Sequence, residues 1–322
     1  MANTLLVTAQ AGGQKLFNFL KRSLHAENNE IHRWIRTGQV RINKKRAKAF
    51  DIVYENDEIR IPPFALNLAD TLPQKAMKEF PLPIIYENEH VLIVNKPQGI
   101  ACQGGTGQEE NIADMLKEYY SAASFVPAPA HRLDKETQGI LLIGKTYQSL
   151  RFLTECMKSD ENSLRQAIRH EAKKIYRAWV YGNIADFARN NPFLCHYLCH
   201  NEERQKEEVF SVSHAANREE IQDIISKYGT RQLAKPTQKA QIALSSLKCL
   251  DVKNGKSLVE IGIYTGRKHQ IRVQLASSGF PLVGDTKYAP KKFLRKEDEF
   301  FLQACKITLP PNNFTEQCVF GI

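Results

Sequence analysis

The apolar residues of this chain fall in short runs of strand length, and this pattern restricts the folds open to it. Val91–Val94 and Ile140–Ile143 are two such runs, the first bounded by polar residues and the second by glycines. Runs of about four to eight apolar residues indicate strands buried in a sheet. No run reaches the roughly 18 apolar residues of a membrane-spanning helix. With 322 residues, 42% of them hydrophobic, we expect a globular protein with one large core and a smaller companion.

Net charge and cysteine usage indicate the kind of partner and the cellular compartment that suit this chain. The chain has 45 lysines and arginines against 35 aspartates and glutamates, a net charge of +10. This excess predicts a polyanionic partner, and by itself it leaves nucleic acid and an anionic membrane surface open. Residues 1–13 lack the pattern of a signal peptide, and the seven scattered cysteines fit reduced thiols better than a disulfide framework. We therefore expect a cytoplasmic protein.

One local cluster consists of Cys195, His196, Cys199 and His200. Its spacing resembles half of a zinc site, but no second pair with matching spacing occurs in the sequence. Cys195, Tyr197 and Cys199 also alternate as the buried face of a strand does. We therefore predict a strand here and no bound metal.

Residues 12–63 have the pattern of a small separate unit. Two helices are indicated by apolar residues at helical spacing, the first by Leu16, Phe19, Leu20 and Leu24, the second by Ile31, Trp34 and Ile35. Asn28 or Asn29 can cap the second helix, and Gly38 suits the left-handed residue after its end. Short extended runs follow at 40–43, 51–54 and 58–61, and Pro62 and Pro63 end the unit.

Basic residues are concentrated on the second helix and the turn after it. Positions 33–48 contain no acidic residue and seven basic ones, namely Arg33, Arg36, Arg41, Lys44, Lys45, Arg46 and Lys48. Such a run is either a solvated face or a phosphate-binding surface. The order of helix, helix, basic turn and strands resembles the S4 RNA-binding domain, with the likeness carried by WIRTGQVRINKKRAKAFDIVYENDEIRIPP. The resemblance implies a small α/β RNA-binding module, and the proline-containing residues 64–83 are predicted to form a linker.

A strongly charged segment, HRLDKETQGI at 131–140, leads directly into the apolar run at 140–143. Asp134 lies between Arg132 and Lys135, whose positive field keeps a carboxylate ionised, as a nucleophile requires. The charge pattern alone is more typical of a surface ion pair. The nearby glycines at 104, 105 and 107 lack the spacing of a phosphate-binding loop, so the sequence indicates no nucleotide cofactor.

The segment HRLDKETQGILLIGKT closely resembles the signature of the RluA-type pseudouridine synthases, in which the aspartate of HRLD is the catalytic nucleophile. Two further blocks match in the family's order: KIYRAWVYG at 174–182 fits K-x-Y-x-A-x-V-x-G, and YTGRKHQIRV at 264–273 fits T-G-R-x-H-Q-I-R. The resemblance implies an α+β catalytic domain at 84–322 around a mixed, largely antiparallel sheet. It also implies an isomerase that flips uridines out of structured RNA and converts them to pseudouridine without a metal or other cofactor.

The resemblance assigns roles to individual residues. Asp134 is the expected nucleophile, and Tyr176 is expected to stack on the target base and to be a candidate proton acceptor. Arg272 is expected to pair with Asp134, on a helix that Thr265 can cap and that Gly279 and Pro281 terminate. Two further arginines are expected to contact RNA: Arg132 and Arg267.

The sequence departs from the family pattern in places, with Gln138, Gln274 and Cys102–Gln103 at unusual positions and with polar insertions at 151–174 and 210–238. Parts of both insertions, 158–169 and 218–231, have helical patterning. Large-subunit (23S) ribosomal RNA is the expected substrate of a monomeric enzyme, with transfer RNA second. A non-catalytic S4-type assembly factor remains an alternative, whereas a glycosidase normally needs a second carboxylate, which the sequence does not indicate.

Overall fold

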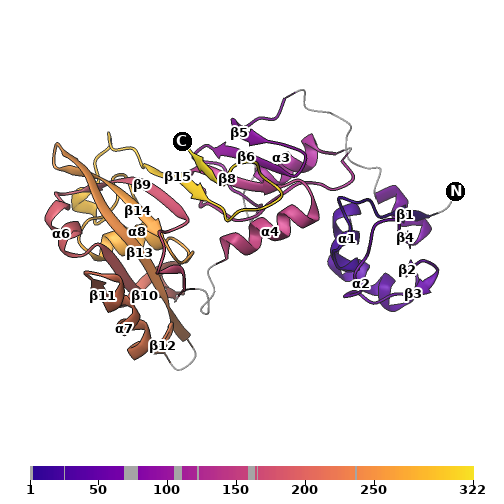
Figure 1. Ribbon diagram of the computed structural model, residues 1–322, viewed down its shortest axis with the longest axis horizontal. Helices are drawn as coiled ribbons and strands as arrows, with labels where there is room; N and C mark the ends of the chain where they lie inside the picture. Colours follow the sequence, from indigo (N-terminus) through magenta and orange to yellow (C-terminus); the bar gives the residue numbers. More distant parts are fainter. Residues whose placement is uncertain are drawn as a thin grey trace.

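A computed structural model describes residues 3–24, 26–68, 79–104, 111–121, 123–158, 164, 166–235 and 238–322. Within them the strands form two sheets, one of four strands near the N-terminus and one of twelve strands. The four-stranded sheet belongs to an N-terminal module (residues 3–61) that lies at one end of the molecule, beyond helix α4 (Tyr147–Met157) (Figure 1).

The N-terminal module has the predicted two helices, α1 (Leu16–Ser23) and α2 (Asn28–Arg36). Its sheet has the order β1-β4-β2-β3, and its strands are β1 (Thr4–Leu6), β2 (Arg41–Ile42), β3 (Lys45–Arg46) and β4 (Glu58–Arg60). Gly38 takes the predicted left-handed conformation with φ +76°. The predicted asparagine cap of α2 is wrong, because Glu27 occupies the N-cap and no side chain caps the helix. The run at 51–54 contributes only a bridge between Ile52 and Lys15.

The twelve-stranded sheet has the main order β11-β10-β13-β14-β9-β15-β8-β6-β5. Among the described strands only β15 and β8 pair in parallel, over two rungs, and the others pair antiparallel. The predicted α+β class with a mixed, largely antiparallel sheet is therefore confirmed. The strands are β5 (Ile84–Glu87), β6 (Val91–Lys96), β7 (Ala128–Pro129), β8 (Gln138–Gly144), β9 (Lys174–Tyr181), β10 (Phe193–Asn201), β11 (Lys206–Ala215), β12 (Arg231–Lys235), β13 (Gln238–Lys253), β14 (Lys256–Ile263), β15 (Leu302–Thr308) and β16 (Val319–Gly321).

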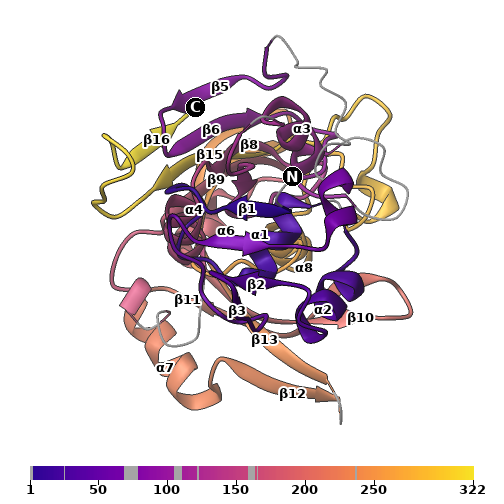
Figure 2. The same cartoon turned by 90° about the vertical axis from the view of Figure 1, so that its right-hand side faces the viewer.

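Helices α3 (Ile112–Tyr119), α6 (Ala185–Asn190), α7 (Arg218–Tyr228) and α8 (Gln270–Ser277) accompany α4 around this sheet, with short 3-10 helices at Pro63–Leu68 and Lys291–Phe293. Helix α7 confirms the helical patterning predicted within 218–231. It lies with β12 at the opposite end of the sheet from β5 in both views (Figures 1 and 2). In the other insertion, residues 159–163 and 165 lie outside the described part of the chain.

The junction of β8 and β15 lies beside the loop that carries Asp134. Gly139, the second residue of β8, pairs with Ala304 of β15 and has φ +116°. A Cβ atom at Gly139 would overlap the backbone of Ala304, so only glycine allows the two strands to approach this closely. The close approach fixes the start of β8 and, with it, the end of the Asp134 loop.

The N-terminal module packs directly on the rest of the protein, and Figure 2 views it from this end with the large sheet behind it. The first amide of α4, that of Tyr147, donates to the carbonyl of Gln10 at 2.9 Å. Arg22 of α1 lies over the Phe125 ring at 4.7 Å and donates to the carbonyl of Val126 at 3.3 Å. The two parts therefore share a hydrogen-bonded interface as well as apolar contacts.

The predicted strand at the cysteine–histidine cluster is confirmed as β10. Cys195, His196 and Tyr197 are all fully buried, because the strand is covered on both faces. Across the described residues, no group of three or more His, Cys, Asp and Glu side chains has the arrangement of a metal site. In the same residues, no helix has the length and apolar character to cross a membrane.

Candidate active site

Asp134 lies in the loop between β7 and β8, and buried backbone contacts shape this loop. The amide of Thr137 donates to the carbonyl of Asp134 at 3.0 Å. The fully buried Lys96, the last residue of β6, donates from Nζ to the carbonyls of Pro97, Ile100 and Lys135 at 2.9, 2.7 and 3.1 Å. Lys96 therefore ties the loop after β6 to the residue that follows Asp134. Burial lowers the pKa of Lys96 to about 8.

Cys102 holds the other side of the loop. The backbone N–H of Leu133 donates to Sγ of Cys102 at 3.2 Å, and the thiol donates to the Leu133 carbonyl at 3.4 Å. Burial raises the pKa of this thiol, so it stays protonated and keeps its donor. The residue before Asp134 is thus fixed by one side chain through both backbone groups.

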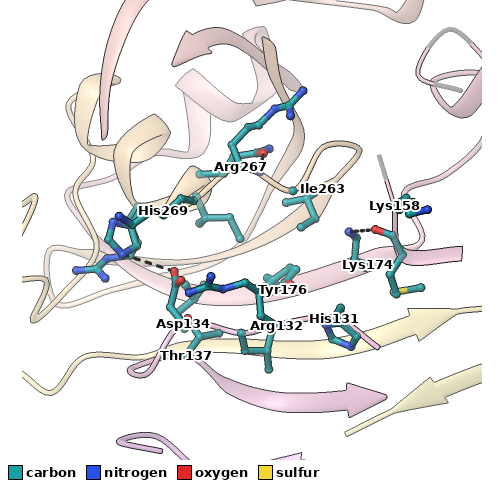
Figure 3. A pocket seen from close by; sticks show the side chains of 18 of the residues that line it. His131, Arg132, Asp134, Thr137, Lys158, Lys174, Tyr176, Ile263, Arg267 and His269 are labelled. Atoms are coloured by element: carbon teal, nitrogen blue, oxygen red, sulfur yellow. Dashed lines mark hydrogen bonds and ion pairs between the residues drawn. The ribbon is translucent and has the colours of Figure 1, made fainter. Parts of the chain in front are cut away.

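A cavity of about 480 Å³ opens beside Asp134, and all three predicted sequence blocks line it. Figure 3 shows Asp134, Tyr176 and His269 on its walls. Of the described residues that line this cavity, only Asp134 is acidic. Its side chain is 24% exposed, so the carboxylate is reachable from the cavity. Six basic residues line the same cavity: Arg132, Lys158, Lys174, Arg267, Lys268 and Arg272.

Tyr176 comes from β9, where it shares a buried face with Ala178 and Val180, as predicted from the alternation. Only 8% of Tyr176 is exposed. Burial raises the pKa of its hydroxyl, and the negative charge of Asp134 raises it further. At neutral pH the ring therefore carries a neutral hydroxyl at the cavity wall, which suits packing against a flat, uncharged base.

His269 is the side chain that approaches Asp134 in an ion-pair geometry. Its Nε2 lies 3.9 Å from Oδ2 of Asp134 (Figure 3). Its Nδ1 lies 2.8 Å from the Tyr288 hydroxyl. Burial lowers the pKa of His269 to about 4, so the ring is neutral at neutral pH. The Tyr288 hydroxyl accepts the Glu207 N–H at 3.2 Å and can donate to Nδ1. This arrangement favours the tautomer with its proton on Nε2, facing Asp134.

Arg272 lines the cavity, but the predicted ion pair with Asp134 is wrong. Its guanidinium instead binds the fully buried Asp285 through two hydrogen bonds, from Nε at 2.9 Å and from Nη2 at 2.6 Å. The rings of Tyr288 and Phe300 each lie 5.2 Å from its Cζ. Burial lowers the pKa of Arg272, but the hydrogen bonds and charge of Asp285 outweigh burial and raise it overall. Arg272 is thus a fixed positive charge near Asp134 rather than its direct partner.

The helix that carries Arg272 ends as predicted and begins differently. Gly279 has φ +90° after the last turn of α8. The predicted Thr265 cap is wrong, because His269 occupies the N-cap in a left-handed conformation with φ +53°. The Thr265 hydroxyl instead accepts the Leu244 N–H and donates to the Gln270 side chain. The buried Gln274 donates to the carbonyls of Leu194 and Ala243, so α8 is anchored on β10 and β13.

Two other residues of the predicted blocks have structural contacts. His131 accepts the Leu142 N–H on Nε2 at 3.2 Å, which braces β8. Arg267 donates from Nε to the Ile242 carbonyl at 3.0 Å, while its side chain still lines the cavity. Arg132 is exposed and extends across the same cavity (Figure 3).

The six basic residues predicted to bind RNA in the N-terminal module are all exposed: Arg33, Arg36, Arg41, Lys44, Lys45 and Arg46. Strands β2 and β3 form a tight hairpin whose two turn residues, Asn43 and Lys44, have φ +48° and +67°. The hairpin places Arg41 directly opposite Arg46. Like charges in this position repel one another across a strand pair. An anion bound at the hairpin would relieve that repulsion.

Sequence reasoning missed three residues of this site. His269 lies inside the predicted block at 264–273, directly before the helix that carries Arg272. This position could have marked it as a site residue. Asp285 and Tyr288 lie 13 and 16 residues after Arg272 in a loop without periodic pattern, and no local signal marks them.

The family model of RNA pseudouridylate synthases matches residues 90–277, more than half of the chain. The chain belongs to the RNA pseudouridylate synthase family. It is therefore an RNA pseudouridine synthase, an isomerase, and the three sequence blocks that meet at the cavity all lie within the matched range.

Curated relatives of this synthase resemble it over most of its length. It is 31% identical to ribosomal large subunit pseudouridine synthase C of Vibrio vulnificus over 289 residues, 87% of this chain and 78% of that protein. It is 30% identical to ribosomal large subunit pseudouridine synthase C of Escherichia coli (strain K12) over 301 residues, 91% of this chain and 82% of that protein.

Solved structures support the fold of this synthase. Human RNA pseudouridylate synthase domain containing 1 is similar with a TM-score of 0.52 at 19% identity, covering 75% of this chain and 85% of that one. Human RNA pseudouridylate synthase domain containing 4 gives a TM-score of 0.50 at 20% identity, covering 71% and 84%.

Proposed function

We propose that this synthase converts specific uridines of large-subunit ribosomal RNA to pseudouridine, with Asp134 as the nucleophile. The observation that carries the role of Asp134 is that, among the described residues that line the cavity, it is the one acidic side chain beside six basic ones. A glycosidase mechanism with two carboxylates has no support in this cavity, because the described part of its lining contains no second carboxylate.

The surroundings of Asp134 suit a reaction on a flipped-out nucleoside. A cavity of about 480 Å³ has room for one base and its sugar. Extruding a uridine costs a few kcal/mol, which stacking on Tyr176 and phosphate contacts from the surrounding cations offset. Asp134 supplies the nucleophile, the bond from the sugar to uracil N1 breaks, the uracil turns, and a bond from the sugar to C5 forms. C5 then loses its proton and N1 carries one, so the product is an isomer of uridine.

The properties of Tyr176 favour stacking as its main role. Its raised pKa makes it a weak acid that keeps its proton at neutral pH. To accept the proton from C5, it would have to release its own at the same time. His269 has a different role. Its ring is neutral, and its Nε2–H faces Asp134 and can donate a hydrogen bond to the carboxylate.

Ribosomal RNA is proposed because the curated relatives are named for the large ribosomal subunit. The test is to map pseudouridine on total cellular RNA from cells that carry either the wild-type protein or Asp134→Ala. Loss of one or a few sites in large-subunit ribosomal RNA supports the proposal. Loss of sites in transfer RNA would instead assign that substrate. An unchanged map would contradict the assignment of Asp134 as the nucleophile.

The basic hairpin and α2 are proposed as an S4-type phosphate-binding surface. Replacing Arg41, Lys44, Lys45 and Arg46 by glutamine should weaken RNA binding and reduce the slope of log affinity against log salt by roughly 0.7 to 0.9 for each phosphate that the variant no longer binds. A matched control replaces four exposed basic residues outside the N-terminal module, Lys248, Lys253, Lys292 and Lys296. Equally weakened binding in the two variants would mean that net charge alone, and not the hairpin, governs binding.

A further inference from the structure

A second hollow of about 510 Å³ adjoins the cavity of Asp134. The two share four lining residues, Met157, Lys158, Lys174 and Ile263. Lys174 lies at the junction, where its Nζ donates to the Met157 carbonyl at 3.3 Å (Figure 3). The two hollows therefore lie next to each other and share one wall.

The walls of the second hollow combine apolar surface with cations. Ile263, Leu309 and Pro310 supply apolar wall, at the ends of β14 and β15. Of the described residues that line it, three are lysines, Lys158, Lys173 and Lys174, and two are glutamates, Glu155 and Glu171. Glu155 is already paired with Lys158 at 2.7 Å. An apolar interior with an excess of cations suits a base with its phosphate.

One wall belongs to the insertion at 151–174 and is anchored in the fold. Leu164 and Ile168 are buried in a small core with α7 and β10. The Tyr264 hydroxyl donates to the His170 carbonyl at 3.2 Å. Arg218 of the second insertion donates to the Arg169 carbonyl at 3.1 Å. The two insertions therefore support each other, and together they hold the far wall of the hollow.

On the basis of the proposed function, we propose that the second hollow binds an unpaired nucleotide of the substrate RNA close to the target uridine. The insertion at 151–174 then selects RNA in which the target uridine and this nucleotide can both leave the base stack. The position of the hollow next to the cavity of Asp134 and its excess of cations favour this occupant over an unconnected ligand. The class of substrate is a loop or bulge with at least two extrudable nucleotides, rather than a continuous duplex.

The first test uses RNA fragments that carry the mapped target uridine and one abasic nucleotide, placed in turn within three positions on either side. At one position the missing base should raise KM by roughly tenfold, as expected when one base no longer stacks on the protein. Ala167→Trp narrows the hollow from the insertion side. This variant should have a raised KM on intact RNA, and its KM should no longer change when the base at the sensitive position is missing. The matched control is Ala216→Trp, an exposed alanine outside both hollows.

The second test reads occupancy without relying on a substitution in the hollow. Cys156 lines the hollow and is half-buried, and the half-buried Cys249 lies on β13 away from it. In Asp134→Ala protein, intact RNA should slow alkylation of Cys156 and not that of Cys249, and the RNA with the critical abasic position should not slow it. Equal alkylation rates of Cys156 with the two RNAs, or an abasic series without a sensitive position, would overturn the proposal. Failure of wild-type protein to modify any of these RNAs would instead contradict the proposed function.

Discussion

His269 and Asp134 face each other on the wall of the cavity, with 3.9 Å between Nε2 and Oδ2. The other ring nitrogen of His269 lies 2.8 Å from the Tyr288 hydroxyl, and the ring of Tyr288 packs on Arg272. A single tyrosine, Tyr288, thus orients His269 beside Asp134 through its hydroxyl and supports the Arg272 guanidinium through its ring.

Tyr288→Phe separates these two contributions. The variant keeps the ring beside Arg272 and removes the hydrogen bond to His269, so kcat should fall by about tenfold with little change in KM. Tyr288→Ala should reduce stability as well. Steady-state kinetics and urea unfolding of both variants make the comparison, and a Tyr288→Phe enzyme with wild-type kcat would show that His269 needs no orienting partner.

The Arg272–Asp285 pair should act as one buried unit. Removing one partner leaves an uncompensated buried charge, so Asp285→Ala should lower the free energy of unfolding by about 3–5 kcal/mol. The double variant Arg272→Met with Asp285→Leu should be less destabilised than Asp285→Ala, although it should be inactive. Urea denaturation of wild type and the two variants measures this coupling. A double variant at least as unstable as Asp285→Ala would indicate that the two side chains do not act as a pair.

Acidification should destabilise the fold through His196. Burial lowers its pKa to about 3, with a further contribution from the neighbouring His214, and its buried Nε2 has no hydrogen-bond partner among the described residues. Because the pKa of an unfolded histidine is near 6.5, the unfolded chain binds the extra proton first as pH falls. The contribution of His196 is therefore complete above about pH 6.5 and declines progressively toward pH 3.

His196→Leu removes this titrating group at similar volume. Urea unfolding at pH 7 and pH 5 should show a smaller drop in stability in the variant than in the wild type. The same drop in both proteins would place the acid sensitivity elsewhere.

Much of the site could be predicted from sequence because its residues stand in fixed spacing on regular elements. Asp134 lies four residues before the apolar strand β8, Tyr176 lies on an alternating strand, and Arg272 lies on a helix. All three line one cavity. The helices of the N-terminal module were predicted for the same reason, since an apolar stripe at helical spacing has to be buried.

The errors concern contacts that depend on loops. The partner of Arg272 proved to be Asp285, in a loop that only the folded sheet brings to α8. Thr265 is of a residue type that often caps helices, but the helix begins four residues later, after the left-handed N-cap residue His269. Local sequence propensity does not predict these contacts, because tertiary hydrogen bonds decide which nearby polar group is used.

The most direct test of the role of Asp134 measures binding and conversion in the same purified variant. Asp134→Asn keeps the shape of the side chain and removes the nucleophile. It should bind the target RNA with a Kd within about threefold of wild type, while single-turnover conversion to pseudouridine falls by on the order of 10⁴-fold or more. Conversion within about tenfold of the wild-type rate would contradict the assignment of Asp134 as the nucleophile.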